Sequence, residues 1–186
     1  ASTDDVVIRA GDSITVTEAA TINSITFNNI SATAATLTVN DGVTLTVTSG
    51  ITLQNSATLN TAATIQGLGT INCASVTVGG TTAASSTTAR TTTLTSTIAA
   101  LSMSGNLAVT SRRDYVTSYR YNNATFALGS GSVTVQTTVA LTAPTSGTAT
   151  MTLATGSQDG TLTLSGSTPF STSGTGTFTF TANGAD

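Results

Sequence analysis

The chain has 186 residues, of which 46 are Thr and 22 are Ser, with no Lys and a net charge of −3. Low charge and many β-branched residues argue against a disordered chain and favour β-strands. The five Arg argue against nucleic-acid binding, because phosphate affinity comes from clustered cations, and the apolar runs are too short for a membrane helix of roughly 18 residues.

The first part of the chain, up to residue 44, predicts short strands separated by turns. Apolar residues alternate with polar ones in the two-residue period of a strand at 6–8, 14–16 and 25–27. An Asn-Asp-Gly turn at 40–42 follows. The less regular spacing before residue 45 indicates wider entry coils.

Residues 45–80 consist of six consecutive hexads: LTVTSG, ITLQNS, ATLNTA, ATIQGL, GTINCA and SVTVGG. The third position of the first five hexads is apolar: Val47, Leu53, Leu59, Ile65 and Ile71. This period is typical of a β-solenoid, in which stacked coils share one interior. Three hexads are expected to form one coil of roughly 18 residues, which places these apolar residues in a common core.

The remainder of the chain predicts further short strands and no helix. Residues 81–97 lose the apolar period and are expected to form a linker or an excursion between coils. The strands expected from 98 to 186 are spaced irregularly, which favours a continued solenoid and leaves a β-sandwich as the alternative. The expected organisation is a β-solenoid at 1–80, the linker or excursion at 81–97 and a second β region at 98–186.

The ends of such a solenoid are expected to promote self-association. A solenoid ends in unpaired strand edges, which proteins usually protect with Lys, Pro or inward charges. This chain has no Lys and few charges. We therefore expect homopolymer formation through the ends, with a capping strand such as DDVVIRAG (4–11) as the alternative.

Several segments carry a family resemblance: TDDVVIRAGDSITVTEAATINSITF, ATLTVNDGVTLTVTSGITL, GTLTLSGSTPF and GTGTFTFTANG. They resemble Thr-rich β modules of large secreted surface proteins of Bacteroidota-type bacteria and, more distantly, the β-helical passengers of autotransporters. The resemblance implies export, an extracellular or cell-surface location, and adhesive or structural duty within a longer or polymeric assembly.

One segment, SRRDYVTSYRYNN at 111–123, concentrates Arg and Tyr, the residue types enriched at binding hot spots. If the segment is one strand, alternate residues share a side and form a contact stripe for a neighbouring subunit or a glycan. The alternative is that the Tyr pack in the core while the Arg and Asp114 lie in a solvated turn. The candidate stripe comprises Arg112, Arg113, Tyr115, Tyr119, Arg120 and Tyr121.

Catalytic and metal-binding constellations are not expected. The chain has no His and no Lys, its acids are scattered, and its one Cys, Cys73, is expected to be buried. A nucleophilic triad lacks a base, and zinc ligation by His and several Cys is impossible. A polysaccharide-active enzyme built on Asp114 with Arg112, Arg113 and Arg120 is kept as a minor alternative, and no cofactor is expected.

Thr-x-Thr units, such as 36–38 and 177–179, raise ice binding as a second minor alternative. An ice-matching face needs these units in register once per coil. Their spacing in the sequence is uneven, so frequent Thr on strands explains them more simply.

Two sequons, at Asn29 and Asn123, are possible glycosylation sites. In a chain so rich in Ser and Thr, matches by chance are expected.

These observations predict a non-enzymatic, extracellular structural protein, the subunit of a self-associating surface filament or sheath. The alternative is an adhesive segment of a large surface protein that binds glycans or a host through the stripe at 112–121.

Overall fold

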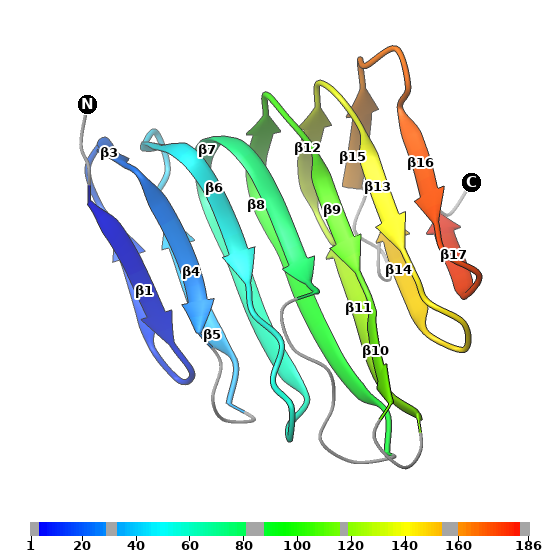
Figure 1. Cartoon of the computed structure of the whole chain (residues 1–186). Helices are drawn as coiled ribbons and strands as arrows, with labels where there is room; N and C mark the ends of the chain where they lie inside the picture. Colours follow the sequence, from blue (N-terminus) through cyan, green and yellow to red (C-terminus); the bar gives the residue numbers. More distant parts are fainter. Residues whose placement is uncertain (1–3, 29–32, 81–87, 116–118, 154–159, 183–186) are drawn as a thin grey trace.

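The computed structural model describes residues 4–28, 33–80, 88–115, 119–153 and 160–182. They form an all-β protein whose strands wind into a three-sided β-solenoid (Figure 1). The predicted all-β solenoid is therefore confirmed, and the C-terminal half continues it instead of forming a sandwich. The strands are β1 (Asp5–Arg9), β2 (Ser13–Val16), β3 (Ala20–Ile22), β4 (Ser24–Asn28), β5 (Ala35–Val39), β6 (Thr44–Leu53), β7 (Thr61–Gly79), β8 (Arg90–Met103), β9 (Leu107–Thr110), β10 (Arg112–Tyr115), β11 (Tyr119–Leu128), β12 (Gly131–Val135), β13 (Val139–Thr142), β14 (Thr148–Leu153), β15 (Gly160–Leu164), β16 (Phe170–Ser173) and β17 (Thr177–Ala182).

The strands stack in parallel on three faces, which we name A, B and C in the order in which the chain visits them. Face A holds β1, β4, the ends of β6 and β7, β9, β13 and β16. Face B holds β2, β5, the starts of β7 and β8, β11, β14 and β17. Face C holds β3, the start of β6, the middle of β7, the end of β8, β12 and β15. The arrows of β4, β9, β13 and β16 accordingly point the same way in Figure 1.

The core consists of apolar columns that run along the inside of the solenoid. Alternate residues of a strand point to opposite sides, so every second residue faces inward. On face A, a column of buried residues occupies matching positions in successive coils: Ile25, Ile51, Val76, Leu107 and Val139. Burial of each aliphatic side chain contributes roughly 1.5–3 kcal/mol, so the stacking of coils is the main source of stability.

The prediction that three hexads form one coil is wrong, because the coils are longer. Leu45 pairs with Ile71 in the next coil, and Leu94 pairs with Phe126, so that more than four hexads separate the members of each pair. The error arises because residues 54–60, between β6 and β7, belong to a corner and not to a strand. Leu59 lies in this corner, half-buried and outside the core, whereas Val47, Leu53, Ile65 and Ile71 are buried in it as predicted.

The corner between faces A and B takes up most of the variation in coil length, with smaller register shifts between Val47 and Gly50 and between Gly67 and Thr70. It spans residues 10–12 in the first coil and 54–60 between β6 and β7, and it includes β10 between β9 and β11. The strands on either side of this corner keep their register with the neighbouring coils, because residues added in the corner do not change which strand residues face inward. Irregularity of the sequence is therefore concentrated at this corner.

A buried polar ladder links three coils at the start of face B. Thr61 Oγ1 donates to Thr92 Oγ1 at 3.1 Å, and Thr92 Oγ1 donates to Asn122 Oδ1 at 3.1 Å. Asn122 Nδ2 donates to the backbone oxygen of Ser56 at 2.7 Å, and Ser111 Oγ donates to the backbone oxygen of Asn122 at 2.9 Å. Asn122 is therefore held by its neighbours on several sides.

The corner between faces B and C requires glycine at two equivalent points. Gly67 and Gly131 have φ values of 114° and 90°. A Cβ at Gly67 would collide with the carbonyl oxygen of Val39, and one at Gly131 with that of Ile98. The coils thus approach each other too closely for a side chain here.

The predicted division at 80 and 97 stays a prediction, although two observations bear on it. β8 begins at Arg90, inside the range 81–97, while residues 81–87 lie outside the described part. One cluster of buried apolar residues extends from Ile8 to Ala149. Within the described residues, no helix is long and apolar enough to cross a membrane.

Candidate functional site

The Arg- and Tyr-rich segment forms a β-hairpin at the corner between faces A and B. β10 runs antiparallel to the start of β11, with Arg113 aligned with Tyr121 and Tyr115 with Tyr119. The prediction of a single strand is therefore wrong, because the chain reverses between Tyr115 and Tyr119. Tyr121 is half-buried, and the side chains of Tyr115 and Tyr119 lie outside the described part.

The hairpin brings the three Arg of the predicted stripe next to a fourth. Arg90 on β8 is aligned with Asn122 from one side of β11, and Arg112 on β10 is aligned with Asn122 from the hairpin. Arg90 was missed because it stands well before Arg112 in the sequence, in a Thr-rich segment without a motif. We name the group of Arg90, Arg112, Arg113 and Arg120 the Arg corner.

Two guanidinium groups of the Arg corner reach the coils beside the hairpin. Arg112 is exposed, and its Nη1 donates to the backbone oxygen of Gly80 at 3.4 Å. Arg113 is half-buried, and its Nη1 donates to the backbone oxygen of Thr145 at 3.5 Å. Gly80 follows β7 and Thr145 precedes β14, so these cations spread along the solenoid axis.

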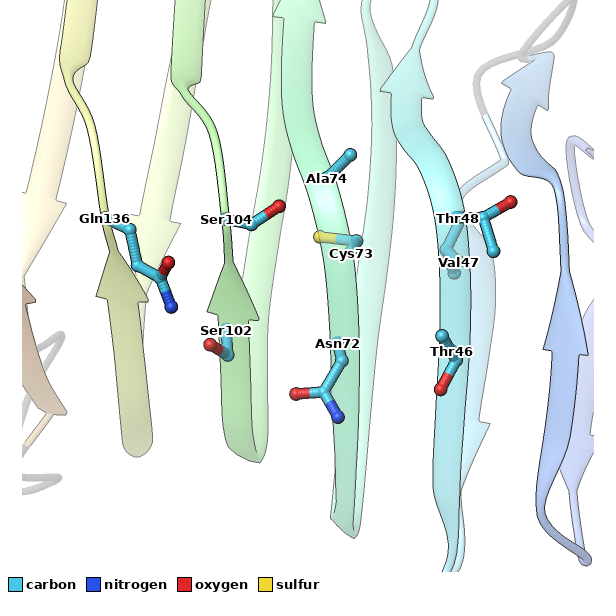
Figure 2. Close-up of a pocket in the computed structure, with 9 residues that line it drawn as sticks. All are labelled: Thr46, Val47, Thr48, Asn72, Cys73, Ala74, Ser102, Ser104 and Gln136. Carbon is cyan, nitrogen blue, oxygen red and sulfur yellow. The ribbon is translucent and has the colours of Figure 1, made fainter.

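A hollow of about 330 Å³ lies on the outer side of face C (Figure 2). Cys73 is 6% exposed, and burial raises the pKa of its thiol to about 12. The thiol is therefore protonated at neutral pH and is a poor nucleophile. Hydroxyl and amide groups around it offer hydrogen bonds but no general acid or base. The lining consists of Thr46, Val47, Thr48, Asn72, Cys73, Ala74, Ser102, Ser104 and Gln136.

The acidic residues that the structure describes do not form a metal-binding cluster. Asp114 is aligned with Arg120 in the hairpin, and its side chain lies outside the described part. The hydrogen bonds from Ser24 Oγ at 2.6 Å and Asn23 Nδ2 at 2.8 Å lower the pKa of the Asp5 carboxyl. In the described ranges, no three His, Cys, Asp or Glu side chains gather around a common point.

Of the two sequons, Asn29 lies outside the described residues, and Asn123 lies within β11. The Asn123 side chain is half-buried, and its Oδ1 accepts a hydrogen bond from the backbone N–H of Thr148 at 2.9 Å. Glycosylation of Asn123 stays a prediction.

Face B carries Thr side chains in register on its outer side. The expectation that the Thr-x-Thr units are not in register once per coil is confirmed for the units 15–17 and 36–38, because Thr15 is aligned with Thr38. Other Thr of face B are nevertheless in register, because the corners absorb the differences in coil length. All of these Thr are half-buried, and the outward residues described on face B carry no charge. On face A, the outward column is interrupted by Ala108 and Ala140. On face B, Ala62 and Ala127 likewise interrupt the outward columns, which leaves two runs of Thr: Thr93, Thr125, Thr150 and Thr179, and Thr36, Thr64 and Thr95.

No protein-family model, no curated protein and no solved structure matches this chain.

Proposed function

We propose that this protein is a non-enzymatic, extracellular structural protein that associates end to end with further copies of itself in a surface filament or sheath. The observation that carries this proposal is that the strands at the two ends of the solenoid, which we name its rims, have one edge without a paired strand among the described residues. Within the described part, the strands of the first coil (β1, β2 and β3) and of the last (β15, β16 and β17) each pair on one side. Such edges are templates for additional strands.

Apolar side chains at the rims support the same proposal. Phe170 and Phe180 are 41% and 48% exposed, and their rings pack edge to face with centroids 5.4 Å apart. At the other rim, Ile14 is 41% exposed. A second copy stacked on either rim would continue the inward columns and remove this apolar area from water.

The charges of β1, in the first rim, are compatible with stacking. Asp5 and Arg9 alternate along β1 with Val6 and Ile8, which face the interior, so the charged residues lie on the outer side. The two rims differ, and a contact between unlike surfaces repeats without closing when the rotation does not return to the start. The expected product is a filament.

The extracellular location rests on the resemblance to secreted surface modules given above. A nearly uncharged, Thr-rich surface with in-register strands also suits a mechanical role, because each coil is bonded to the next through its backbone.

Sedimentation velocity and electron microscopy of the purified chain over a wide concentration range test the proposal. Wild-type protein is expected to form concentration-dependent linear polymers. Phe180→Lys places a charge in the rim contact and should suppress them. Leu68→Lys is the matched control, because Leu68 is 71% exposed at the corner between faces B and C, away from both rims. Monodisperse monomers at high concentration, or equal losses in both variants, would contradict the proposal.

Ice binding is the second candidate function, and the Thr columns of face B favour it. Parallel strands repeat at about 4.8 Å, and residues of one side repeat along a strand at about 6.6 Å. The two Thr columns present uncharged rows of hydroxyl and methyl groups at the strand spacing, and they lie side by side in β8, at Thr93 and Thr95. Such rows can order water on the scale of the oxygen spacings in ice.

Thermal hysteresis and inhibition of ice recrystallisation test this second candidate. Thr125→Tyr disrupts a Thr column at the centre of face B and should abolish most of either activity. Thr52→Tyr is the control, because Thr52 lies at an outward position on face A. Absence of both activities in the wild type would rule the candidate out, as would equal effects of the two substitutions.

A further inference from the structure

Four of the five Arg in the chain lie at one corner, and this concentration calls for an explanation. The chain has eight acidic residues and a net charge of −3, so the rest of the molecule is markedly more negative than the Arg corner. The hairpin and β8 bring the four cations together although they span residues 90–120. Among the aligned residues of β10 and β11 in the hairpin, Asp114 is the one acidic residue.

The backbone fixes the separation of these cations. Arg90 and Arg112 are both aligned with Asn122, from strands that flank β11. Strands are spaced at about 4.8 Å, so the Cα atoms of Arg90 and Arg112 lie about 10 Å apart. Arg120 lies two residues before Asn122 on β11 itself.

The Arg corner stands on a rigid base. Asn122 is 1% exposed and joins Thr92, Ser56 and Ser111 through the hydrogen bonds described above. Cations mounted beside such a residue need little reorganisation when they bind. In addition, Arg90 Nε and Arg120 Nε are buried and have no hydrogen-bond partner among the described residues.

We infer that the Arg corner is a binding site for a linear acidic polysaccharide. Guanidinium groups recognise carboxylates through paired, charge-assisted hydrogen bonds. Arg112 and Arg113 extend towards the coils before and after the hairpin, so a polymer along the solenoid axis meets several cations in succession. Thr91, next to Arg90, and Thr145, whose backbone oxygen accepts from Arg113, are exposed and offer hydrogen bonds to sugar hydroxyls. The negative charge of the rest of the chain disfavours a nucleic acid, which carries a higher charge density.

Binding of the full chain to immobilised polygalacturonate tests this inference, with neutral dextran and single-stranded DNA as comparison probes. We expect binding to polygalacturonate at low salt that weakens strongly at about 0.5 M salt, and no binding to dextran. Arg112→Gln with Arg113→Gln should weaken binding at least about tenfold. Arg90→Gln, which leaves the hairpin sequence intact, should also weaken it.

Arg9→Gln is the matched control, because Arg9 is the fifth Arg and lies exposed on β1, on face A. It should bind like the wild type, and circular dichroism should show that all variants remain folded. Absence of binding to polygalacturonate at low salt would overturn the inference. So would an equal loss in Arg9→Gln, or tighter binding to single-stranded DNA than to polygalacturonate.

Discussion

Thr92 and Asn122 lie in neighbouring coils, and their side chains meet inside the solenoid, with Thr92 Oγ1 donating to Asn122 Oδ1 at 3.1 Å. Both residues are buried, at 0% and 1% exposure. A hydrogen bond of this kind favours one register of the coils, because a shift would leave both groups unpaired in the core.

Asn122→Ala is therefore expected to lower the free energy of unfolding by about 3 kcal/mol, because it removes the acceptor of the Thr92 hydroxyl and the donor to the Ser56 carbonyl in the core. Urea unfolding followed by circular dichroism measures the change. Asn72→Ala, at an exposed position on face C, should change stability by less than about 0.5 kcal/mol. Equal losses in the two variants would contradict the role of the ladder.

Ser96→Ala is expected to stabilise the protein. Ser96 lies in an inward column between Ile65 and Leu128, and its buried Oγ has no hydrogen-bond partner among the described residues. Removing this hydroxyl should raise the free energy of unfolding by about 1 kcal/mol. Ser102→Ala, at an outward position of the same strand, should be nearly neutral. A loss of stability in Ser96→Ala would show that the hydroxyl is satisfied.

Gly67→Ala is expected to destabilise the protein far more than Gly42→Ala. Both glycines have positive φ, 114° and 69°, and the strain of an L-residue in this region is about 1–2 kcal/mol. At Gly67 the added Cβ also collides with the carbonyl oxygen of Val39, whereas nothing lies within 4 Å of a Cβ at Gly42. Thermal unfolding should separate the two variants by at least about 2 kcal/mol, and similar melting temperatures would argue against the close packing of coils at this corner.

Stability is expected to fall in alkaline solution because of Cys73. Burial raises the pKa of the folded thiol to about 12 from its ordinary value of 9.0. Between these values the unfolded chain loses the proton and the folded chain keeps it, so the free energy of unfolding falls by about 1.4 kcal/mol per pH unit. Below the ordinary value the thiol is protonated in both states and makes no such contribution.

The control for this pH dependence is Cys73→Ala. The two proteins differ only at residue 73, so the difference between their pH profiles isolates Cys73. Urea unfolding at several pH values should give a shallower decline for Cys73→Ala, and parallel profiles would contradict the burial of the thiol.

The sequence predicted the solenoid because apolar residues recur at regular inward positions wherever one strand follows another without a long corner between them. Leu53 and Ile65 show this, since both are buried in the common core. Leu59 shows the limit: it fits the hexad but lies in a corner. The period of the sequence does not distinguish a strand from a corner of similar composition. The hexads alone therefore predict a coil that is shorter than the one in the structure.

The candidate site was predictable only in part. The local composition identified Arg112, Arg113 and Arg120, but it did not reveal that the chain reverses between β10 and β11. Residues opposite one another in an antiparallel pair lie on the same side of the sheet, and so do alternate residues of a single strand. The sequence pattern therefore does not distinguish a hairpin from one strand. Arg90 and the Thr columns of face B depend on pairing between coils. That pairing is set by corner lengths, which the sequence pattern did not reveal.

Disulfide trapping of the rim contact tests the central proposal most directly. If copies stack in register, β16 of one copy lies beside β1 of the next, and the outward residues Ser171 and Val7 become neighbours, because both continue one column of face A. Residues on adjacent strands are close enough for a disulfide.

The double variant Val7→Cys, Ser171→Cys is therefore predicted to give a ladder of linear multimers under mild oxidation. Leu68→Cys with Ser171→Cys is predicted to give none. Monomers alone from the first variant, or the same ladder from both, would contradict end-to-end association.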